Sequence, residues 1–197
     1  LEYASTPAFD RLASEGRSGM LHTIPSGLHP GSEVANATIL GYDLTEVYEG
    51  RGPLEAASMG YEMTADDMAM RCNILTLTSD GLIQNHHGGH LTTDEGRDII
   101  EMLDRKLGSD RVKFLPGVQY RHLLVIKGGD KRIVTTPPHD NPGKEWRNLL
   151  VRPIDGNDTA LPGKMSPRET ADLINSLILR SQELLAEHPL SKRHEEQ

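Results

Sequence analysis

Ser32 has the local sequence of a nucleophile that could accept a phosphoryl group. It follows a glycine in the run His29-Pro30-Gly31-Ser32, where a loop turns into a predicted helix. The first backbone N–H groups of a helix lack partners and lie at the positive end of its dipole, so a hydroxyl there is well placed to hold or attack a phosphate. Serine is also a preferred helix cap, and the local sequence leaves that second interpretation open.

Histidines supply further candidates for chemistry. His139 precedes Asp140 and follows two prolines, so it could be an oriented imidazole that contacts a substrate, or a solvated residue in an Asx turn. His86 and His87 are adjacent. Neighbours on an extended chain point to opposite faces, so one metal rarely takes both, and we expect surface or hydrogen-bonding roles for them. We predict no self-contained metal site, and the chain has no H-E-x-x-H pattern.

The first 60 residues predict short elements around Ser32. Helices are predicted over residues 6–16, 32–40 and 53–59 from their caps, prolines and terminal glycines. The alternating residues from about 18 to 30 predict a strand that runs into the Ser32 loop.

The remaining residues predict a small sheet covered by two long helices. Capping boxes, Thr92 with Glu95 and Ser166 with Glu169, predict helices from about residue 93 to 107 and 167 to 187. Their apolar faces need a sheet to cover. Strand-like runs lie at residues 71–77, 112–115, 120–126 and 132–135. The fold class is therefore α/β, with an α+β unit, and residues 137–165 are predicted to form a long functional or mobile loop.

Composition and charge exclude several classes of protein. The 197 residues carry a net charge of −8, which argues against general nucleic-acid binding. No apolar run approaches the roughly 20 residues that span a bilayer, and the first residues lack the order of a signal peptide. The single cysteine, Cys72, rules out an internal disulfide. We expect a soluble cytoplasmic protein with no membrane or nucleic-acid partner, and its oligomeric state is not predicted.

Several strings in the chain carry a family resemblance. The pattern Thr6-Pro7-x-x-Asp10-x-Leu12-Ala13-x-x-Gly16 resembles a segment of sulfatases and phosphoglycerate mutases in the alkaline phosphatase superfamily. Longer strings follow it in the right order: HPGSEVAN from residue 29, LGYD from 40, YEGRGPLEA from 48, RCN from 71, GHLTT from 89, GVQYRH from 117 and TPPHD from 136. Together they resemble the archaeal-type cofactor-independent phosphoglycerate mutases over nearly the whole chain.

The resemblance implies a chemistry for Ser32. In such enzymes the matching serine is phosphorylated while 3-phosphoglycerate and 2-phosphoglycerate are interconverted, a step of glycolysis and gluconeogenesis. It lies against two divalent metal ions, manganese or zinc and possibly magnesium, which lower its pKa. The family's other metal ligands lie outside the matched segments. The resemblance therefore implies an internal fragment that keeps only Ser32 as a metal ligand, binds no metal by itself and is inactive alone.

The resemblance also implies a division into domains. We expect residues 1–62 to be the nucleophile-bearing part of an alkaline-phosphatase-like metal domain. Residues 63–190 would be an inserted cap domain, with a small mixed sheet and two long helices, that binds the substrate. Residues 191–197 would be a charged tail.

Arginines in the matched strings are the predicted substrate ligands, because guanidinium groups suit both phosphate and carboxylate. Arg71 and Arg121 with His122 are the main candidates, and His139 joins them. Arg51, which lies between two glycines, ranks below these. A structural salt bridge is the alternative for each arginine.

Two other functions remain open from the sequence. Bacterial members of the family have been assigned as homoserine kinases, which would keep the site and change the phosphate acceptor. The chain could also be a cap or binding domain without activity of its own.

Overall fold

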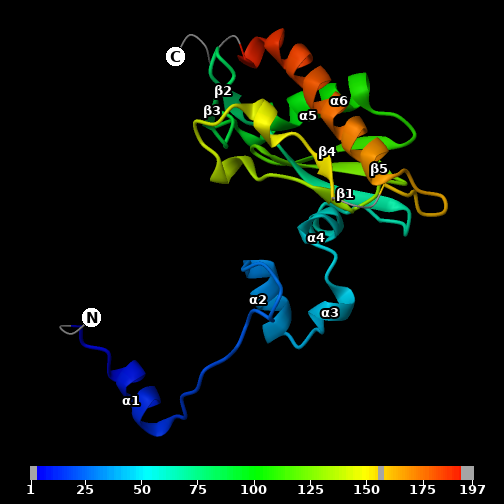
Figure 1. Cartoon of the computed structure of the whole chain (residues 1–197). Helices are drawn as coiled ribbons and strands as arrows, with labels where there is room; N and C mark the ends of the chain where they lie inside the picture. Colours follow the sequence, from blue (N-terminus) through cyan, green and yellow to red (C-terminus); the bar gives the residue numbers. More distant parts are fainter. Residues whose placement is uncertain (1–3, 155–157, 192–197) are drawn as a thin grey trace. The chain divides into compact units, whose positions relative to one another are not determined.

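The computed structural model describes residues 4–154 and 158–191, and the chain divides into two compact units, Leu1–Tyr48 and Glu49–Gln197. Figure 1 shows the elements in order along the chain. The division falls earlier than the boundary expected after residue 62. The reason is that helix α4 (Arg51–Ser58) packs against strand β1 (Asp67–Asn73) and so belongs to the second unit.

The first unit contains three short helices, α1 (Pro7–Glu15), α2 (Ser32–Ile39) and α3 (Leu44–Val47). The predicted helices near Pro7 and Ser32 are confirmed. The strand predicted between residues 18 and 30 is wrong, because none of residues 4–48 is in a strand and an extended segment needs a neighbouring strand to satisfy its backbone groups.

The second unit is built on an antiparallel sheet. Strands β4 (Val112–Val118) and β5 (Arg121–Lys127) form a hairpin, and β1 pairs with the other edge of β5, giving the order β1-β5-β4. The expected mixed sheet is therefore wrong, since all these pairs are antiparallel. The short strands are β2 (Thr76–Leu77), β3 (Ile83–Asn85), β6 (Ile133–Val134) and β7 (Arg152–Pro153), which pair as β2-β3 and β6-β7.

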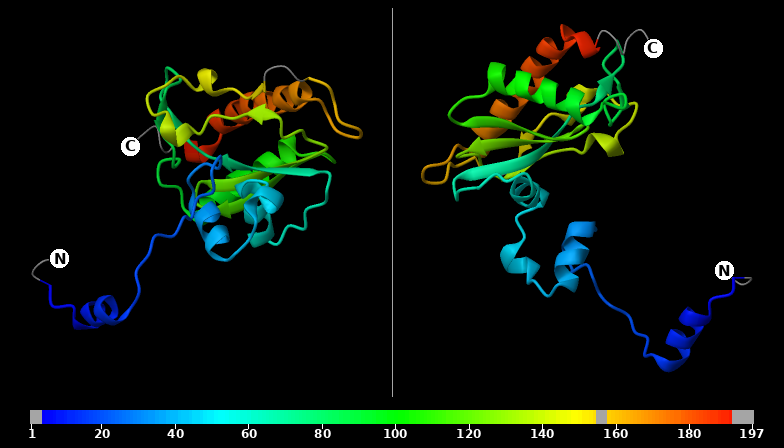
Figure 2. Two further views of the ribbon diagram at one scale, coloured as in Figure 1. Left: turned by 60° about the horizontal axis from the view of Figure 1, so that its bottom comes forward. Right: turned by 180° about the vertical axis from the view of Figure 1, so that it is seen from behind.

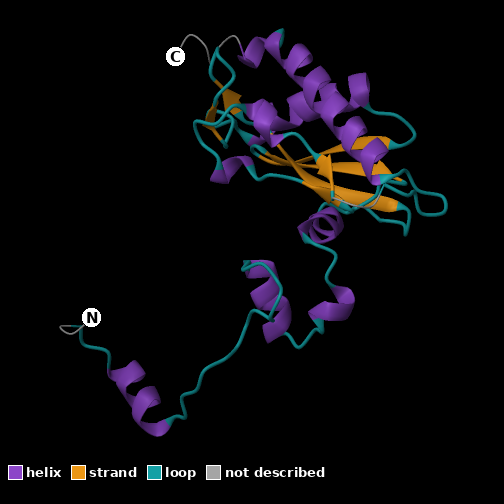
Figure 3. Cartoon of the chain, in the orientation of Figure 1, coloured by secondary structure: helices purple, strands orange, loops and turns teal. Residues whose placement is uncertain are grey.

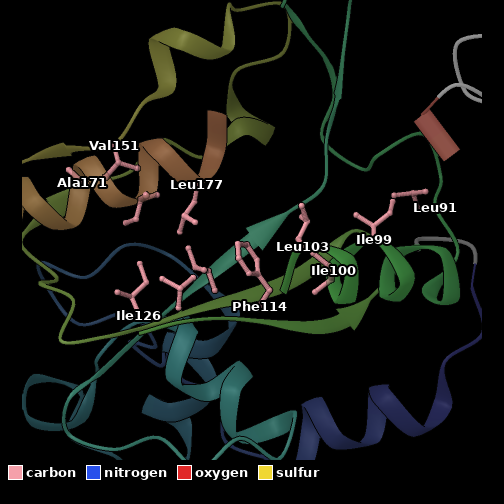
Figure 4. Packing of buried hydrophobic residues seen from close by; sticks show 12 residues of the cluster. Leu91, Ile99, Ile100, Leu103, Phe114, Ile126, Val151, Ala171 and Leu177 are labelled. Atoms are coloured by element: carbon pink, nitrogen blue, oxygen red, sulfur yellow. The ribbon is translucent and has the colours of Figure 1, made fainter. Parts of the chain in front are cut away.

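The two long helices, α5 (Thr93–Leu107) and α6 (Pro167–Ala186), lie together on one face of the sheet, as Figure 3 shows. Both predicted capping boxes are present. The helices and the sheet enclose the core drawn in Figure 4, to which Ile100, Phe114 and Ile126 contribute buried side chains. No helix in the described ranges is long and apolar enough to span a membrane.

Helix α4 covers the opposite face of the sheet, as the views in Figure 2 show. Its closest approach is at Gly52, where an added Cβ would lie 1.9 Å from the carbonyl oxygen of Ala69 on β1. Leu123 and Val125 of β5, which alternate with the residues that face α5 and α6, are buried. The sheet is thus covered on both faces.

The long loop predicted from residue 137 is partly structured by contacts. It contains the 3-10 turns η1 (Pro138–Asp140) and η2 (Trp146–Leu149). The Gly143 N–H donates to the Ile83 carbonyl at 2.8 Å, and the Ile83 N–H donates to the Lys144 carbonyl at 2.9 Å. These bonds attach the loop to β3.

The contact at Gly52 predicts a steric effect on stability. Gly52→Ala should destabilise the second unit by roughly 1–3 kcal/mol, because backbone must shift to admit the methyl group. The control Ala57→Ser changes an exposed residue of the same helix and should stay within about 0.5 kcal/mol. Urea unfolding followed by the fluorescence of Trp146, the single tryptophan, measures both. Equal effects would contradict the steric argument.

Candidate functional site

Ser32 is the first residue of α2 and is exposed. The N-cap is Gly31, whose carbonyl accepts the N–H of Ala35 at 3.0 Å, and no side chain caps this helix end. The alternative that Ser32 is only a helix cap is therefore wrong. Its hydroxyl lies at a helix start without being used to hold the helix, which is the arrangement that a phosphate-accepting group needs.

Two of the predicted arginines share one carboxylate in the second unit. Glu55 of α4 lies 3.6 Å from Nε of Arg51, and it accepts hydrogen bonds from both Nε of Arg71, at 3.3 Å, and Nη2 of Arg71. Glu55 and Arg71 are half-buried between α4 and β1. A guanidinium carries five N–H donors, and Glu55 accepts from Nε and Nη2 of Arg71, so this pair holds the Arg71 side chain in a fixed orientation beside α4.

Arg121 lies on the same face of the sheet as Arg71. Asn73 of β1 pairs with Arg121 of β5, so Arg71, two residues earlier, is its diagonal neighbour at about 7–8 Å between backbones. The Arg121 guanidinium lies 5.1 Å from the ring centre of Tyr120, and no ion pair involves it within residues 4–154 and 158–191. Arg121 is thus a positioned cation with donors for an anion.

A series of ring contacts joins Tyr120 to four histidines, and we call these five residues the histidine cluster: His86, His87, His90, His139 and Tyr120. The ring centres of His86 and Tyr120 are 6.2 Å apart, those of His86 and His139 are 6.2 Å apart, and those of His87 and His90 are 4.3 Å apart. His139 itself lies 3.7 Å from Asp140, which is too far for a hydrogen bond. The structure therefore brings His139 and Arg121 to the same ring cluster, through residues that are far apart in sequence.

The main connecting residues of the site were not predicted from the sequence. Glu55 follows Arg51 at the i,i+4 spacing of a helical ion pair, which could have marked it. His86 and His90 have the H-x-x-x-H spacing, but residues 86–90 are not helical and His90 has a φ of 63°, so the spacing does not place both on one helix face. Tyr120 carries no sequence signal of its role.

His122 is fully buried, so the expectation that it and Arg121 contact a ligand side by side is corrected. Successive residues of a strand face opposite ways, and His122 faces α5, where an added Cβ on Gly96 would lie 3.1 Å from its Cε1. Its Nδ1 accepts the N–H of Gly117 at 3.0 Å. Burial, partly offset by the backbone of Gln119, lowers the pKa of His122 to about 4, so the ring is neutral at pH 7.

The described residues do not form a metal site. No three or more His, Cys, Asp or Glu side chains in the described ranges are arranged to hold an ion. Burial raises the pKa of the Cys72 thiol to about 11, which keeps it protonated and a poor ligand or nucleophile at neutral pH. Ser32 is thus the better candidate nucleophile.

Comparison with known proteins identifies the family. The family model described as 2,3-bisphosphoglycerate-independent phosphoglycerate mutase matches residues 13–191. The chain belongs to this family. A Methanosarcina mazei protein with that name is 42% identical over 199 residues, which cover 100% of this chain and 46% of that protein. A Geobacter sulfurreducens protein, named a probable member, is 40% identical over 200 residues, again with 46% of its length covered.

A solved structure of the family supports the fold. The cofactor-independent phosphoglycerate mutase of Thermoplasma acidophilum superposes with a TM-score of 0.58 at 26% identity, covering 95% of this chain and 47% of that one. The chain therefore spans about half the length of the phosphoglycerate mutases it matches. The resemblance to archaeal-type enzymes is confirmed, and the names of these relatives give no support to the homoserine kinase alternative.

The low pKa of His122 predicts loss of stability in mild acid. Between the ordinary pKa of 6.5 and the folded value of about 4, the unfolded chain binds a proton that the folded chain does not. The contribution is therefore complete above pH 6.5 and is lost as the pH falls towards 4, by up to about 3 kcal/mol. His122→Asn, which cannot titrate, should flatten this part of the curve in urea unfolding from pH 7.5 to 4.5. An unchanged slope would contradict the assignment.

Because Glu55 pairs with both Arg51 and Arg71, its loss should reduce stability more than the loss of the exposed pair between Glu49 and Lys131. Glu55→Gln should destabilise the second unit by about 1–3 kcal/mol, because it removes the negative charge that pairs with the half-buried Arg71 and with the exposed Arg51. Glu49, which pairs with Lys131, is the matched control because both side chains are more than half exposed. Glu49→Gln should cost less than about 1 kcal/mol. Thermal and urea unfolding compare the two variants, and equal losses would argue against a special role for Glu55.

Proposed function

We propose that this chain supplies the nucleophile and part of the substrate site of a cofactor-independent phosphoglycerate mutase. The family match supports the reaction class. The observation that carries the substrate assignment is the placement of Arg51, Arg71 and Arg121 on the face of the sheet that α4 covers, with Glu55 between the first two. An alkaline-phosphatase-like arrangement of the first unit and a cap role for the second are parts of the same proposal.

The proposed substrate matches the charge of this face. A phosphoglycerate carries a phosphate and a carboxylate, and guanidinium groups bind both with paired N–H donors. Arg71 and Arg51 hold one anionic group beside Glu55, while Arg121 and His139, a member of the histidine cluster, hold the other. The chain is acidic overall, at −8, so this local group of cations accounts for anion binding where net charge does not.

Ser32 carries the proposed transfer. Its Oγ forms a bond to the phosphorus of 3-phosphoglycerate while the bond from phosphorus to the C3 oxygen breaks. The serine proton leaves to a base, and a proton is supplied to the C3 oxygen. The C2 hydroxyl of the bound glycerate then attacks the phosphoserine and loses its proton, which gives 2-phosphoglycerate and restores the serine.

The metal ions implied by the resemblance do not fit the described residues. No group of side chains in the described ranges could hold one, and a serine hydroxyl is a single ligand. Metal ligation by Ser32 therefore remains a proposal that needs ligands other than these residues.

Replacement of Ser32 separates activity from stability. In a protein with the full length of the relatives, Ser32→Ala should abolish conversion of 3-phosphoglycerate, because no covalent intermediate can form. Since Ser32 does not cap α2, stability should change by less than about 0.5 kcal/mol. Ser18→Ala, another exposed serine of the same unit, is the control and should leave activity unchanged.

Mass spectrometry tests the same assignment directly. During turnover the full-length protein should carry a phosphate on Ser32, whereas the 197-residue chain incubated with 3-phosphoglycerate should accumulate none. An active alanine variant, or a phosphate on a different residue, would show that the nucleophile is assigned wrongly.

A further inference from the structure

The hairpin between β4 and β5 carries Tyr120 and Arg121 at its tip. Its backbone is unusual there, because Gln119 has a φ of 55°, a left-handed conformation that is costly for a residue with a side chain. The cost persists only if surrounding contacts hold the turn. The contacts that hold it therefore set the position of the Arg121 guanidinium and of the Tyr120 ring beneath it.

Besides the strand pairing of Val118 with Arg121, three contacts hold this turn. The Tyr120 carbonyl accepts the N–H of Ile74 at 3.0 Å, and the hydroxyl of Thr93, at the start of α5, accepts the N–H of Gln119 at 3.4 Å. The third joins the two strands of the hairpin: Nδ1 of His122 on β5 accepts the N–H of Gly117 on β4 at 3.0 Å. Of the three, only the third joins the two strands through the side chain next to Arg121.

His122 cannot move away from this bond. It is fully buried, and Gly96 of α5 packs so closely that a Cβ there would lie 2.1 Å from the Gln119 carbonyl and 3.1 Å from the imidazole. Its Nε2 has no hydrogen-bond partner in the described ranges. The ring is therefore held by packing on one side and by the Gly117 N–H on the other.

We propose that His122 is a positioning residue, which locks the hairpin so that Arg121 is presented to the anionic substrate. The proposal rests on the proposed function, because it assumes that Arg121 contacts phosphoglycerate. His122 acts through the backbone of the turn and does not touch the ligand. It thus has a role in the site that differs from the one the sequence suggested.

The hydrogen bond from the Gly117 N–H to Nδ1 of His122 requires a neutral imidazole. Protonating Nδ1 would place a donor opposite the Gly117 N–H and break the bond, and burial opposes that proton. No charged side chain in the described ranges contributes to the pKa shift of His122, which burial lowers and the Gln119 backbone raises. Cys72 is the cross-strand partner of His122, Glu95 of α5 binds Thr92 in the capping box, and Asp94 forms an exposed pair with Arg97. The hydrogen bond between Gly117 and His122 should therefore break in mild acid.

Two replacements of His122 distinguish the effect of its hydrogen bond to Gly117 from the effect of its packing in the core. His122→Phe fills the space but offers no acceptor, whereas His122→Asn can present its Oδ1 to the Gly117 N–H and does not titrate. Both variants are compared with the wild-type 197-residue chain. The NMR amide exchange rate of Gly117 measures whether its hydrogen bond to residue 122 is intact, and titration with 3-phosphoglycerate measures the affinity of the site. The Phe variant should show at least about tenfold faster exchange at Gly117 and about tenfold weaker binding.

The Asn variant should restore both properties at pH 7. It should also keep them at pH 5, where the wild-type chain begins to lose them. If the Phe variant lowers only the unfolding midpoint, while Gly117 stays protected and binding is unchanged in the folded protein, His122 is merely structural and the proposal is overturned.

Arg121→Ala distinguishes that failure from failure of the proposed function. If Arg121→Ala weakens binding about tenfold while His122→Phe does not, only the positioning role is lost. If the wild-type chain does not bind 3-phosphoglycerate, or if Arg121→Ala binds it as well as wild type, the substrate assignment fails and the positioning role fails with it.

Discussion

The alternation of side chains along β5 is the constraint on which the second unit depends. The strand lies in the middle of the sheet, with α5 and α6 on one face and α4 on the other. Each residue is therefore assigned to one layer by its position. Arg121 is exposed on the α4 side, and His122 is buried on the α5 side. A shift of one residue in the register would exchange them and would bury an unpaired guanidinium, which is strongly unfavourable.

Local signals in the sequence located the long helices but gave a strand between residues 18 and 30 that does not form, and they did not give the partners of the elements. The capping boxes at Thr92 and Ser166 fixed the starts of α5 and α6 because capping involves residues only three apart. Pairing between Glu55 and Arg71, or between the rings of His86 and His139, joins segments that only the folded chain brings together. The antiparallel direction of the sheet likewise follows from strand pairing, which no single run specifies.

The site residues were predictable by type but not by role. The family strings marked Arg71, Arg121 and His122 without saying which way each side chain points. Their burial in the folded chain differs because a neutral histidine can be enclosed at modest cost, whereas an arginine needs water or an acidic partner. Arg71 has Glu55 as that partner, and Arg121 is exposed over an aromatic ring. Both keep their charge available because neither is fully enclosed.

The division into two units separates the proposed chemistry from the proposed recognition. Ser32 belongs to a unit of short helices in which α1 buries none of its residues, and helices of this length are marginal without tertiary packing. The arginines and histidines belong to a unit with its own core beneath a covered sheet. On the proposed function, substitutions in that core would therefore change substrate affinity through the position of the hairpin, while a substitution at Ser32 would change only the transfer step.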